Sequence, residues 1–391
     1  MRTTVGIIGA GPAGLLLARL LHNAGIDSVV LESRDRAYVE QRQRAGILEQ
    51  GTVDALRAAG AGERMDREGL RHDGIELRFD RRRHRVDFPG LTGGRSVMVY
   101  AQTEVCKDLI ALQLKEGGPL LFEAEALAVE GAESDRPSVR FRREGREDVL
   151  ECEYVVGCDG FWGVARKAIP AELSRVFERT YPFGWLGILA DVPPSHDELI
   201  YARHERGFAL LSMRSPSVSR LSLQVPADTD ARSWTDEEIW DELERRFETD
   251  DDWTLRRGPI TQKSVTPMRS FVHEPMRHGR LFLAGDAAHI VPPTGAKGLN
   301  LAVGDVITFA RALVHRRQTG SEELLDAYSA HCLRRVWQAE RFSYDMTTML
   351  HRDPDATPFE ERLQLARLDR IASCRAAETD LAEGYTGFPI D

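Results

Sequence analysis

Residues 4–32 read TVGIIGAGPAGLLLARLLHNAGIDSVVLE, and this stretch decides how the chain begins to fold. The apolar run Val5–Ile8 predicts a buried strand, and the leucine-rich run Leu15–Ala24 predicts a helix. A second apolar run, Ser28–Leu31, predicts another short strand. Two strands joined by one helix form a βαβ unit, which places the strands parallel in one sheet.

Glycines occupy the turn between the first strand and the helix in the spacing G-x-G-x-x-G. Gly9 permits a tight turn, Gly11 lets a pyrophosphate approach the backbone, and Gly14 lets the helix pack against the strand. Glu32 ends the second strand, where a carboxylate can accept a hydrogen bond from a ribose hydroxyl. Because the strands, glycines, helix and acid occur in register, we predict a dinucleotide-binding site here.

Composition and charge limit the classes of function. The chain has 391 residues, of which 42% are hydrophobic and 29% charged, as in a folded protein of more than one domain. The net charge of −10 argues against nucleic acids and anionic membranes as partners. We expect no leader peptide and no membrane span. Five cysteines without a CxxC pair favour free thiols in the cytoplasm over disulfides or a metal site.

The remaining patterns predict an α/β fold with a second, β-rich region. Residues 175–275 mostly show strand-like spacing, with one helix near Asp236–Phe247, and are expected to form a largely antiparallel substrate-binding sheet. Residues 1–174 together with 276–320 are expected to form a discontinuous nucleotide-binding domain. Residues 321–391 have a mostly helical pattern, and we expect them to supply the contact of a homodimer.

Two further segments indicate which dinucleotide binds. Val155–Gly160 reads VVGCDG, a strand that ends in an Asp-Gly turn, and Arg280–His289 reads RLFLAGDAAH, a strand that ends in Gly-Asp. In this order, the three motifs resemble those of the single-component flavoprotein monooxygenases, which carry FAD and hydroxylate aromatic rings. The resemblance implies that Asp286 binds the ribitol hydroxyls of FAD and that Asp159 serves both FAD and NAD(P)H.

A loop rich in proline and glycine, Pro292–Gly298, leads into a predicted helix. The start of a helix presents unpaired N–H groups and the positive end of the helix dipole. In the family, backbone N–H groups near Leu299 and Asn300 face the isoalloxazine ring, and Lys297 would add positive charge near it. The resemblance also implies FAD contacts for Arg44, Gln102 and Arg220.

The nicotinamide cofactor needs a different kind of site. Only one G-x-G-x-x-G motif is present, so we expect no second dinucleotide domain. NAD(P)H would then dock on the surface and reach a flavin that moves. The resemblance assigns the NAD(P)H contacts to Tyr38, Arg42, Arg166 and Arg269.

Within this family, the chain most resembles the hydroxylases that act on 4-hydroxybenzoate. The resemblance is densest in Arg44–Gly51, Tyr181–Gly187 and Arg280–Leu301. It implies hydroxylation of 4-hydroxybenzoate ortho to its phenol, with NAD(P)H and O2, through a C4a-hydroperoxyflavin. The implied substrate residues are Tyr201, Ser212, Arg214, Ser222, Pro293 and Tyr385.

The chemistry of that reaction explains these residue types. An ionised phenol makes the ring electron-rich, and hydrogen bonding by Tyr201, continued by Tyr385 toward His72, would stabilise the phenolate and lead its proton to solvent. Arg214 suits a two-point contact with the substrate carboxylate, with Ser212 as an additional donor. The resemblance places the Pro293 carbonyl close to the substrate hydroxyl.

Alternatives remain open on the sequence alone. Ser222 stands where the family usually has a tyrosine, so a substituted substrate such as 3-amino-4-hydroxybenzoate is an alternative. An FAD oxidase or dehydrogenase without oxygen insertion would return any consumed O2 as H2O2. A non-catalytic flavoprotein that senses aromatic acids would bind ligand without stimulating NAD(P)H oxidation.

Overall fold

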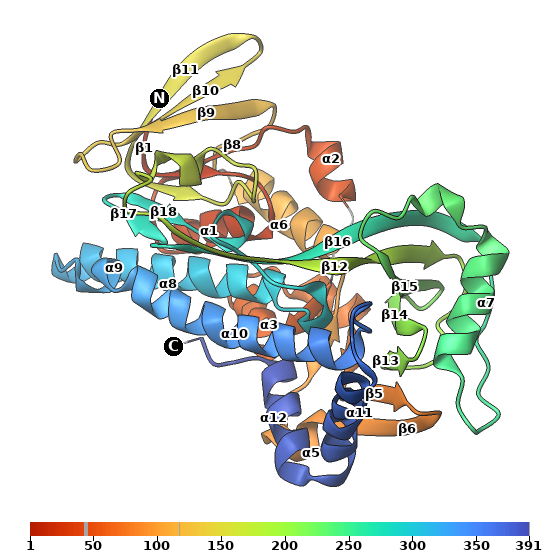
Figure 1. Ribbon diagram of the computed structural model, residues 1–391. Helices are drawn as coiled ribbons and strands as arrows, with labels where there is room; N and C mark the ends of the chain where they lie inside the picture. Colours follow the sequence, from red (N-terminus) through yellow and green to blue (C-terminus); the bar gives the residue numbers. More distant parts are fainter. Residues whose placement is uncertain (43–45, 117, 391) are drawn as a thin grey trace.

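The computed structural model describes residues 1–42, 46–116 and 118–390, which form two eight-stranded sheets, a small third sheet and several long helices (Figure 1). The first sheet has the strand order β17-β18-β11-β1-β2-β8, and β10 and β9 extend it beyond β11. Its strands are β1 (Arg2–Ile8), β2 (Ser28–Leu31), β8 (Leu120–Leu121), β9 (Ala124–Glu130), β10 (Ser138–Arg143), β11 (Arg146–Gly157), β17 (Arg277–His278) and β18 (Leu281–Leu283). The predicted α/β fold is confirmed.

The strand β1 lies between β11 and β2 and runs parallel to both. The helix α1 (Pro12–Asn23) follows it and buries Leu15, Leu16, Leu17 and Leu21. Pro12 suits the first turn of α1, because the N–H that proline lacks has no helical partner there. The carboxyl ends of these parallel strands meet at one edge, which is where ligands bind in open α/β sheets.

The second sheet has the order β19-β16-β12-β15-β14-β13-β5-β6 and is antiparallel except for the pairing of β13 with β5. Its strands are β5 (Gly74–Phe79), β6 (Arg82–Asp87), β12 (Arg175–Ala190), β13 (Leu199–His204), β14 (Gly207–Ser215), β15 (Val218–Pro226), β16 (Ile260–Glu274) and β19 (His289–Ile290). The interval 175–275 therefore holds only part of this sheet, because β5 and β6 extend one edge and β19 extends the other. The pattern at residues 70–100 suggested strands but not their partner.

Helices cover both faces of the second sheet (Figure 1). On one face, α7 (Asp236–Phe247) packs over Leu186 and Ile200. On the other face, α10 (Tyr328–Leu350), α11 (Pro358–Ser373) and α12 (Arg375–Thr386) pack over Trp185 and Tyr201. Because side chains alternate along a strand, Tyr201 faces Tyr385 of α12 while Ile200 faces α7.

The third sheet is a three-stranded element with the order β3-β7-β4. It consists of β3 (Ile47–Glu49), β4 (Leu70–His72) and β7 (Val97–Val99). The other helices are α2 (Arg36–Gln41), α3 (Gln50–Ala58), α4 (Glu63–Glu68), α5 (Phe88–Thr92), α6 (Gln102–Glu116), α8 (Gly298–Thr319) and α9 (Glu323–Asp326). Among helices of the described residues, none combines the length and apolar character that a membrane span requires. The five cysteines are free thiols.

A buried arginine ties β5 to the end of α7. Arg78 is only 2% exposed, and its Nε donates to Glu76 Oε1 at 2.6 Å. Its Nη1 donates to the Phe247 carbonyl at 2.7 Å, and its guanidinium lies 3.9 Å from the ring centroid of Trp253. Without Arg78, the buried carboxylate of Glu76 would keep only the partly exposed Arg83 as an arginine partner, and it would lose much of its compensation in a medium of low dielectric.

Arg78→Met should therefore lower the free energy of unfolding by about 3 kcal/mol, measured by chemical denaturation. Arg81→Met is the matched control, because Arg81 and its partners Glu248 and Asp250 are exposed. The control should change stability little. Equal effects of the two substitutions would contradict this account of Arg78.

His72 of β4 is 1% exposed, and burial lowers its pKa to about 4. An unfolded histidine has a pKa of about 6.5. Between about pH 4 and pH 6.5, residue 72 therefore binds a proton in the unfolded chain but not in the folded chain. The free energy of unfolding should therefore fall as pH drops from about 6.5 to about 4. His72→Asn should flatten this dependence in melting curves recorded across that range, and an unchanged slope would exclude His72 as its source.

Candidate active site

The three glycines of the first turn form a close-packed cradle. A Cβ on Gly9 would lie 2.4 Å from the Cys158 carbonyl oxygen, and the φ of Gly9 is +102°. A Cβ on Gly14 would lie 2.0 Å from the Gly9 carbonyl oxygen, so helix and turn touch here. A Cβ on Gly11 would meet nothing within 4 Å, which leaves open space at the start of α1. This combination fits a pyrophosphate at the helix N-terminus.

Glu32 lies at the end of β2 and is held by the backbone. Its Oε2 accepts from Ala10 N at 2.7 Å, and its Oε1 accepts from Arg34 N at 2.8 Å. Oε1 also accepts from Ser33 Oγ at 3.3 Å, whereas Oε2 has a second lone pair for a further donor. The geometry leaves Glu32 able to accept from a ribose hydroxyl.

Two aspartates lie at the ends of other strands of the first sheet. Asp286 is exposed although almost every residue from 281 to 289 around it is buried, so its carboxylate faces outward from a packed strand end. Asp159 follows β11, and its Oδ2 accepts from Ala165 N at 2.9 Å. Its Oδ1 is buried and has no partner among the described residues, and burial raises the pKa of this carboxyl. Both arrangements fit a bound group rich in hydroxyls.

The helix α8 starts close to this edge of the sheet. Its first intrahelical hydrogen bond is donated by Leu301 N to the Lys297 carbonyl at 2.9 Å, so the N–H groups of Leu299 and Asn300 precede the bonded part of the helix. The Asn300 side chain is engaged in hydrogen bonds with neighbouring segments. Its Oδ1 accepts from Glu49 N and Thr52 Oγ1, and its Nδ2 donates to two carbonyls, so it links α8 to β3 and α3.

Lys297 differs from the expectation of a charge directed at the flavin. It is 1% exposed, and its ammonium donates to Glu49 Oε1 at 2.7 Å and to the Tyr385 carbonyl at 2.9 Å. Burial lowers the pKa of Lys297, and the Glu49 carboxylate opposes that shift. Its ammonium therefore supports the position of Tyr385.

An inner cavity lies between the second sheet, the third sheet and the loop before α8. It brings together five of the predicted substrate residues with Arg220, whereas Tyr385 lies directly behind Tyr201. The lining residues are Gly46, Ile47, Val99, Ala101, Trp185, Tyr201, Leu210, Ser212, Met213, Arg214, Arg220, Ser222, Pro293 and Ala296.

Two buried tyrosines meet at one end of the inner cavity. The hydroxyl oxygens of Tyr201 and Tyr385 are 2.7 Å apart, and either hydroxyl can be the donor. Burial raises the pKa of both phenols, so both stay protonated near neutral pH. Phe88 stacks on Tyr385 with 5.1 Å between ring centroids, which fixes the ring. The pair can therefore pass a proton without ionising at rest.

Two arginines line another part of the same cavity. Arg214 Nη2 donates to Thr103 Oγ1 at 3.0 Å, and burial lowers the pKa of Arg214. Burial, and then the positive charge of Arg214, lower the pKa of Arg220 to about 10. Ser212 Oγ donates to the Arg220 carbonyl at 2.9 Å. A carboxylate in the cavity would offset the repulsion between these guanidinium groups.

The predicted relay residue His72 is not among the residues that line the inner cavity, but its strand β4 pairs with β7, whose Val99 lines it. Both of its ring nitrogens are buried and have no hydrogen-bond partner among the described residues. No hydrogen bond joins it to Tyr385 in the part of the chain that the structure describes. Buried polar atoms are normally bonded, so a water bridge is expected at this ring.

The residues predicted to contact NAD(P)H fall into two groups. Tyr38 is 43% exposed, and Arg34 and Arg42 lie 5.1 and 5.9 Å from its ring centroid. Arg166 and Arg269 both lie over the ring of Phe161, at 4.9 and 4.7 Å. Each group presents cationic and aromatic surface. Of the predicted FAD contacts, Gln102 begins α6, and Arg44 lies outside the described residues.

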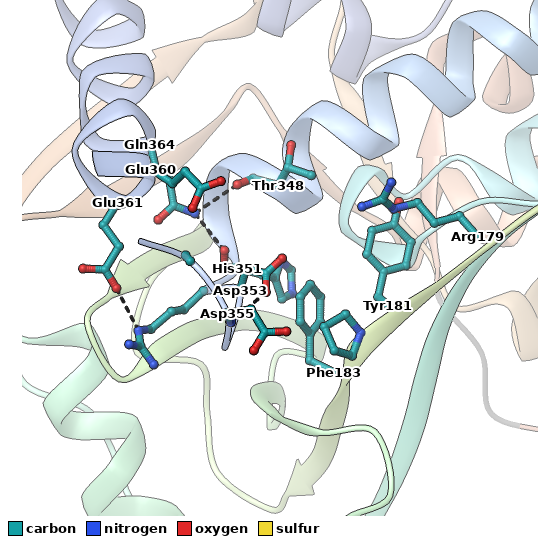
Figure 2. Close-up of a pocket in the computed structure, with 13 residues that line it drawn as sticks. Arg179, Tyr181, Phe183, Thr348, His351, Asp353, Asp355, Glu360, Glu361 and Gln364 are labelled. Atoms are coloured by element: carbon teal, nitrogen blue, oxygen red, sulfur yellow. Dashed lines mark hydrogen bonds and ion pairs between the residues drawn. The ribbon is translucent and has the colours of Figure 1, made fainter. Parts of the chain in front are cut away.

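Two features were missed by the sequence reasoning. Trp185 lines the inner cavity. Its segment, Tyr181–Gly187, resembles the family in sequence, but the resemblance predicts no role for Trp185. A separate surface pocket lies beyond Trp185, between β12, the end of α10 and the start of α11 (Figure 2). Its lining residues are Arg179, Tyr181, Pro182, Phe183, Thr348, His351, Arg352, Asp353, Asp355, Ala356, Glu360, Glu361 and Gln364.

Comparison with known proteins places this geometry in a family. Residues 2–343 match the family model described as FAD binding domain. The chain is 48% identical over 391 residues to p-hydroxybenzoate hydroxylase of Acinetobacter baylyi. The aligned region covers 100% of this chain and 96% of that relative. The 3-(3-hydroxy-phenyl)propionate/3-hydroxycinnamic acid hydroxylase of Mycobacterium avium is 27% identical, over 90% of this chain and 61% of its own length.

A solved structure supports the same fold. The p-nitrophenol 4-monooxygenase of Pseudomonas putida has a TM-score of 0.84 to this chain, with 99% of both chains covered and 19% identity. The chain contains the glycine cradle, the outward-facing Asp286 and the tyrosine pair. Its similarity to p-hydroxybenzoate hydroxylase extends over its whole length. The chain belongs to the FAD-binding family that includes p-hydroxybenzoate hydroxylase, and it is an FAD-dependent aromatic monooxygenase.

Proposed function

We propose that this enzyme hydroxylates 4-hydroxybenzoate at the carbon ortho to its phenol and forms 3,4-dihydroxybenzoate. The reaction consumes one O2, one NAD(P)H and one proton, and it releases one water and NAD(P)+. The observation that carries the proposal is one cavity lined by Tyr201, whose hydroxyl meets that of Tyr385, and by Arg214 and Arg220. Arg214 lies four residues along β14 from Leu210, the strand partner of Tyr201, so the phenol pair and the guanidinium lie in different parts of the cavity. A benzoate with a para hydroxyl presents complementary groups at its two ends.

The phenol end of the substrate would meet Tyr201. A hydrogen bond from the Tyr201 hydroxyl favours the phenolate, because a donor stabilises the charged form. The substrate proton can leave through Tyr201 to Tyr385, since either hydroxyl of this pair can donate. His72 is the proposed next acceptor, with a water between it and Tyr385. An ionised oxygen enriches the ortho carbon in electron density, which is where an electrophilic oxygen atom adds.

The carboxylate end would meet the arginines. Arg214 can make a two-point contact with a carboxylate, and Arg220 adds a second positive charge. Ser212 and Ser222 lie in the same wall as small polar groups. Pro293 borders the cavity, and its carbonyl is proposed to accept from the substrate hydroxyl before that hydroxyl ionises. Contacts at both ends would fix the orientation of the substrate ring in the cavity.

FAD, when bound, takes a hydride from NAD(P)H and activates O2. The chain would hold FAD with Gly9, Gly11, Gly14, Glu32 and Asp286, and with the N–H groups at the start of α8. Asp159, Arg44, Gln102 and Arg220 remain proposed contacts. Tyr38, Arg42, Arg166 and Arg269 are the proposed contacts for NAD(P)H, and the positive charge of the three arginines suits its phosphates.

We also propose that the protein forms a homodimer and is located in the cytoplasm. Phe359 and Leu363 of α11 are 72% and 50% exposed, so apolar surface is available for a second copy. Free thiols are usual in a reducing compartment, and the five cysteines are free.

A second candidate substrate follows from Ser222. Its side chain is small, buried and part of the cavity wall. A short side chain leaves space beside the substrate carboxylate or ring, so a 3-substituted 4-hydroxybenzoate such as 3-amino-4-hydroxybenzoate is the alternative. The reaction and the roles of the other residues would be the same.

The test of function is a screen of substituted benzoates for stimulation of NAD(P)H oxidation, with each product identified by its mass. We expect 4-hydroxybenzoate to gain one oxygen atom. Turnover of only the 3-amino compound would favour the alternative, and full recovery of O2 as H2O2 would indicate an oxidase.

Arg214→Ala should raise the dissociation constant for 4-hydroxybenzoate by about a hundredfold or more while FAD content stays normal, because a carboxylate loses its charged partner.

Tyr201→Phe should slow hydroxylation far more than it weakens substrate binding, because it removes the hydroxyl that favours the phenolate. The absorbance of bound substrate measures this directly, since phenolate and phenol differ in the ultraviolet. We expect the apparent pKa of the bound phenol to rise in the variant. An unchanged pKa and unchanged rate would remove Tyr201 from the reaction.

A further inference from the structure

The wall of the inner cavity contains a tryptophan whose orientation is fixed by one hydrogen bond. Trp185 of β12 is 7% exposed and stacks on Phe208 with 5.4 Å between centroids and 17° between planes. Stacking alone leaves an indole able to slide or flip in its plane. The only polar atom of the ring is a donor, Nε1, and it donates to His351 Nε2 at 2.7 Å.

This contact determines the tautomer of His351. Since Nε2 accepts from Trp185, the proton of a neutral imidazole must lie on Nδ1, which donates to the Thr347 carbonyl at 3.0 Å. Burial lowers the pKa of His351 to about 3, so the ring is neutral in the working range. Phe183 stacks on it at 4.8 Å and 6°, and Phe208 lies at 4.3 Å. The imidazole is held as a fixed acceptor.

The end of α10 connects this acceptor to a second wall of the cavity. Thr347 accepts from His351 through its carbonyl, and its hydroxyl lies 2.9 Å from Thr294 Oγ1. Thr294 follows Pro293, which lines the inner cavity. Gln364 of α11 donates to the His351 carbonyl at 2.7 Å, as Figure 2 shows from the surface pocket. One helical turn thus supports both Trp185 and the Pro293 loop.

We propose that His351 is a positioning residue for hydroxylation, which holds the indole of Trp185 in one orientation against the aromatic substrate. This inference rests on the proposed function. The imidazole does not line the inner cavity and touches no reacting atom. Its effect reaches the substrate through Trp185, which determines the shape of the cavity where the benzoate ring lies.

The consequence is a selective effect of the acceptor nitrogen. Without it, the buried indole N–H has no partner, and Trp185 is expected to leave its present orientation to find one. Substrate affinity should then fall by about tenfold, because an unmade buried hydrogen bond is costly. A substrate ring that is held less firmly should also raise the fraction of consumed O2 that is released as H2O2.

The experiment compares His351→Phe, which keeps an aromatic ring but loses the acceptor, with His351→Gln, which places an amide oxygen near the Nε2 position. Each FAD-loaded variant is titrated with 4-hydroxybenzoate through the flavin absorbance. The emission of Trp185 is obtained as the difference from the matching Trp185→Phe protein. We expect weaker binding and a shift of Trp185 emission to shorter wavelength in His351→Phe, and substantial recovery of both in His351→Gln.

A double-mutant cycle with Trp185→Phe is the control for the route of the effect. If His351 acts through Trp185, His351→Phe should add little to the loss of affinity already caused by Trp185→Phe. An equal loss in both backgrounds would overturn the inference, as would unchanged affinity and emission in His351→Phe. Absence of substrate binding and turnover in the unmodified FAD-loaded enzyme would instead overturn the proposed function, and with it the role in hydroxylation.

Discussion

The buried ion pair between Lys297 and Glu49 is the contact on which the arrangement of the site depends. The ammonium of Lys297 contacts Glu49 of β3 and the Tyr385 carbonyl of α12, and Arg335 of α10 lies 3.4 Å from the second oxygen of Glu49. Four segments that are distant in the sequence thus meet at one cluster of three charged groups. A buried charge is tolerated only with its partner in place, so these segments must come together in one geometry.

The positions of the phenol pair and of the start of α8 follow from that constraint. Tyr385 reaches Tyr201 because its own backbone is held by Lys297, and α8 begins where the same residue ends the preceding loop. Asn300 adds three hydrogen bonds between α8 and the segments near Glu49, and a fourth to the Ala296 carbonyl in the loop before α8. The phenol pair and the edge of the first sheet are therefore positioned by the same group of buried polar contacts.

The sequence predicted those features that depend on local order along the chain. The turn around Gly9 and the helix Asp236–Phe247 could be read directly, because their periodicity and spacing are local. The pairing of β5 with β13 could not, since nothing in residues 74–79 specifies a partner more than a hundred positions later.

The same limit applies to the site. Resemblance named Tyr201 and Arg214, and both border the inner cavity. The partners of Lys297 and His351 are set by tertiary packing: a lysine beside a glycine-rich loop suggests a ligand charge, and only the fold reveals Glu49 beside it. A histidine at a helix end carries no sequence signal that it accepts from Trp185.

The distribution of the two sheets along the chain also sets an order of events during synthesis. The first sheet is complete when β18 ends at Leu283, whereas the tyrosine pair needs α12, which starts at Arg375. Domains tend to fold as they emerge from the ribosome. The core of this half also takes residues of α8 and of α10 as far as Ala339. A nascent chain can therefore complete its nucleotide-binding half while α12, which closes the compartment for the aromatic ring, has yet to emerge.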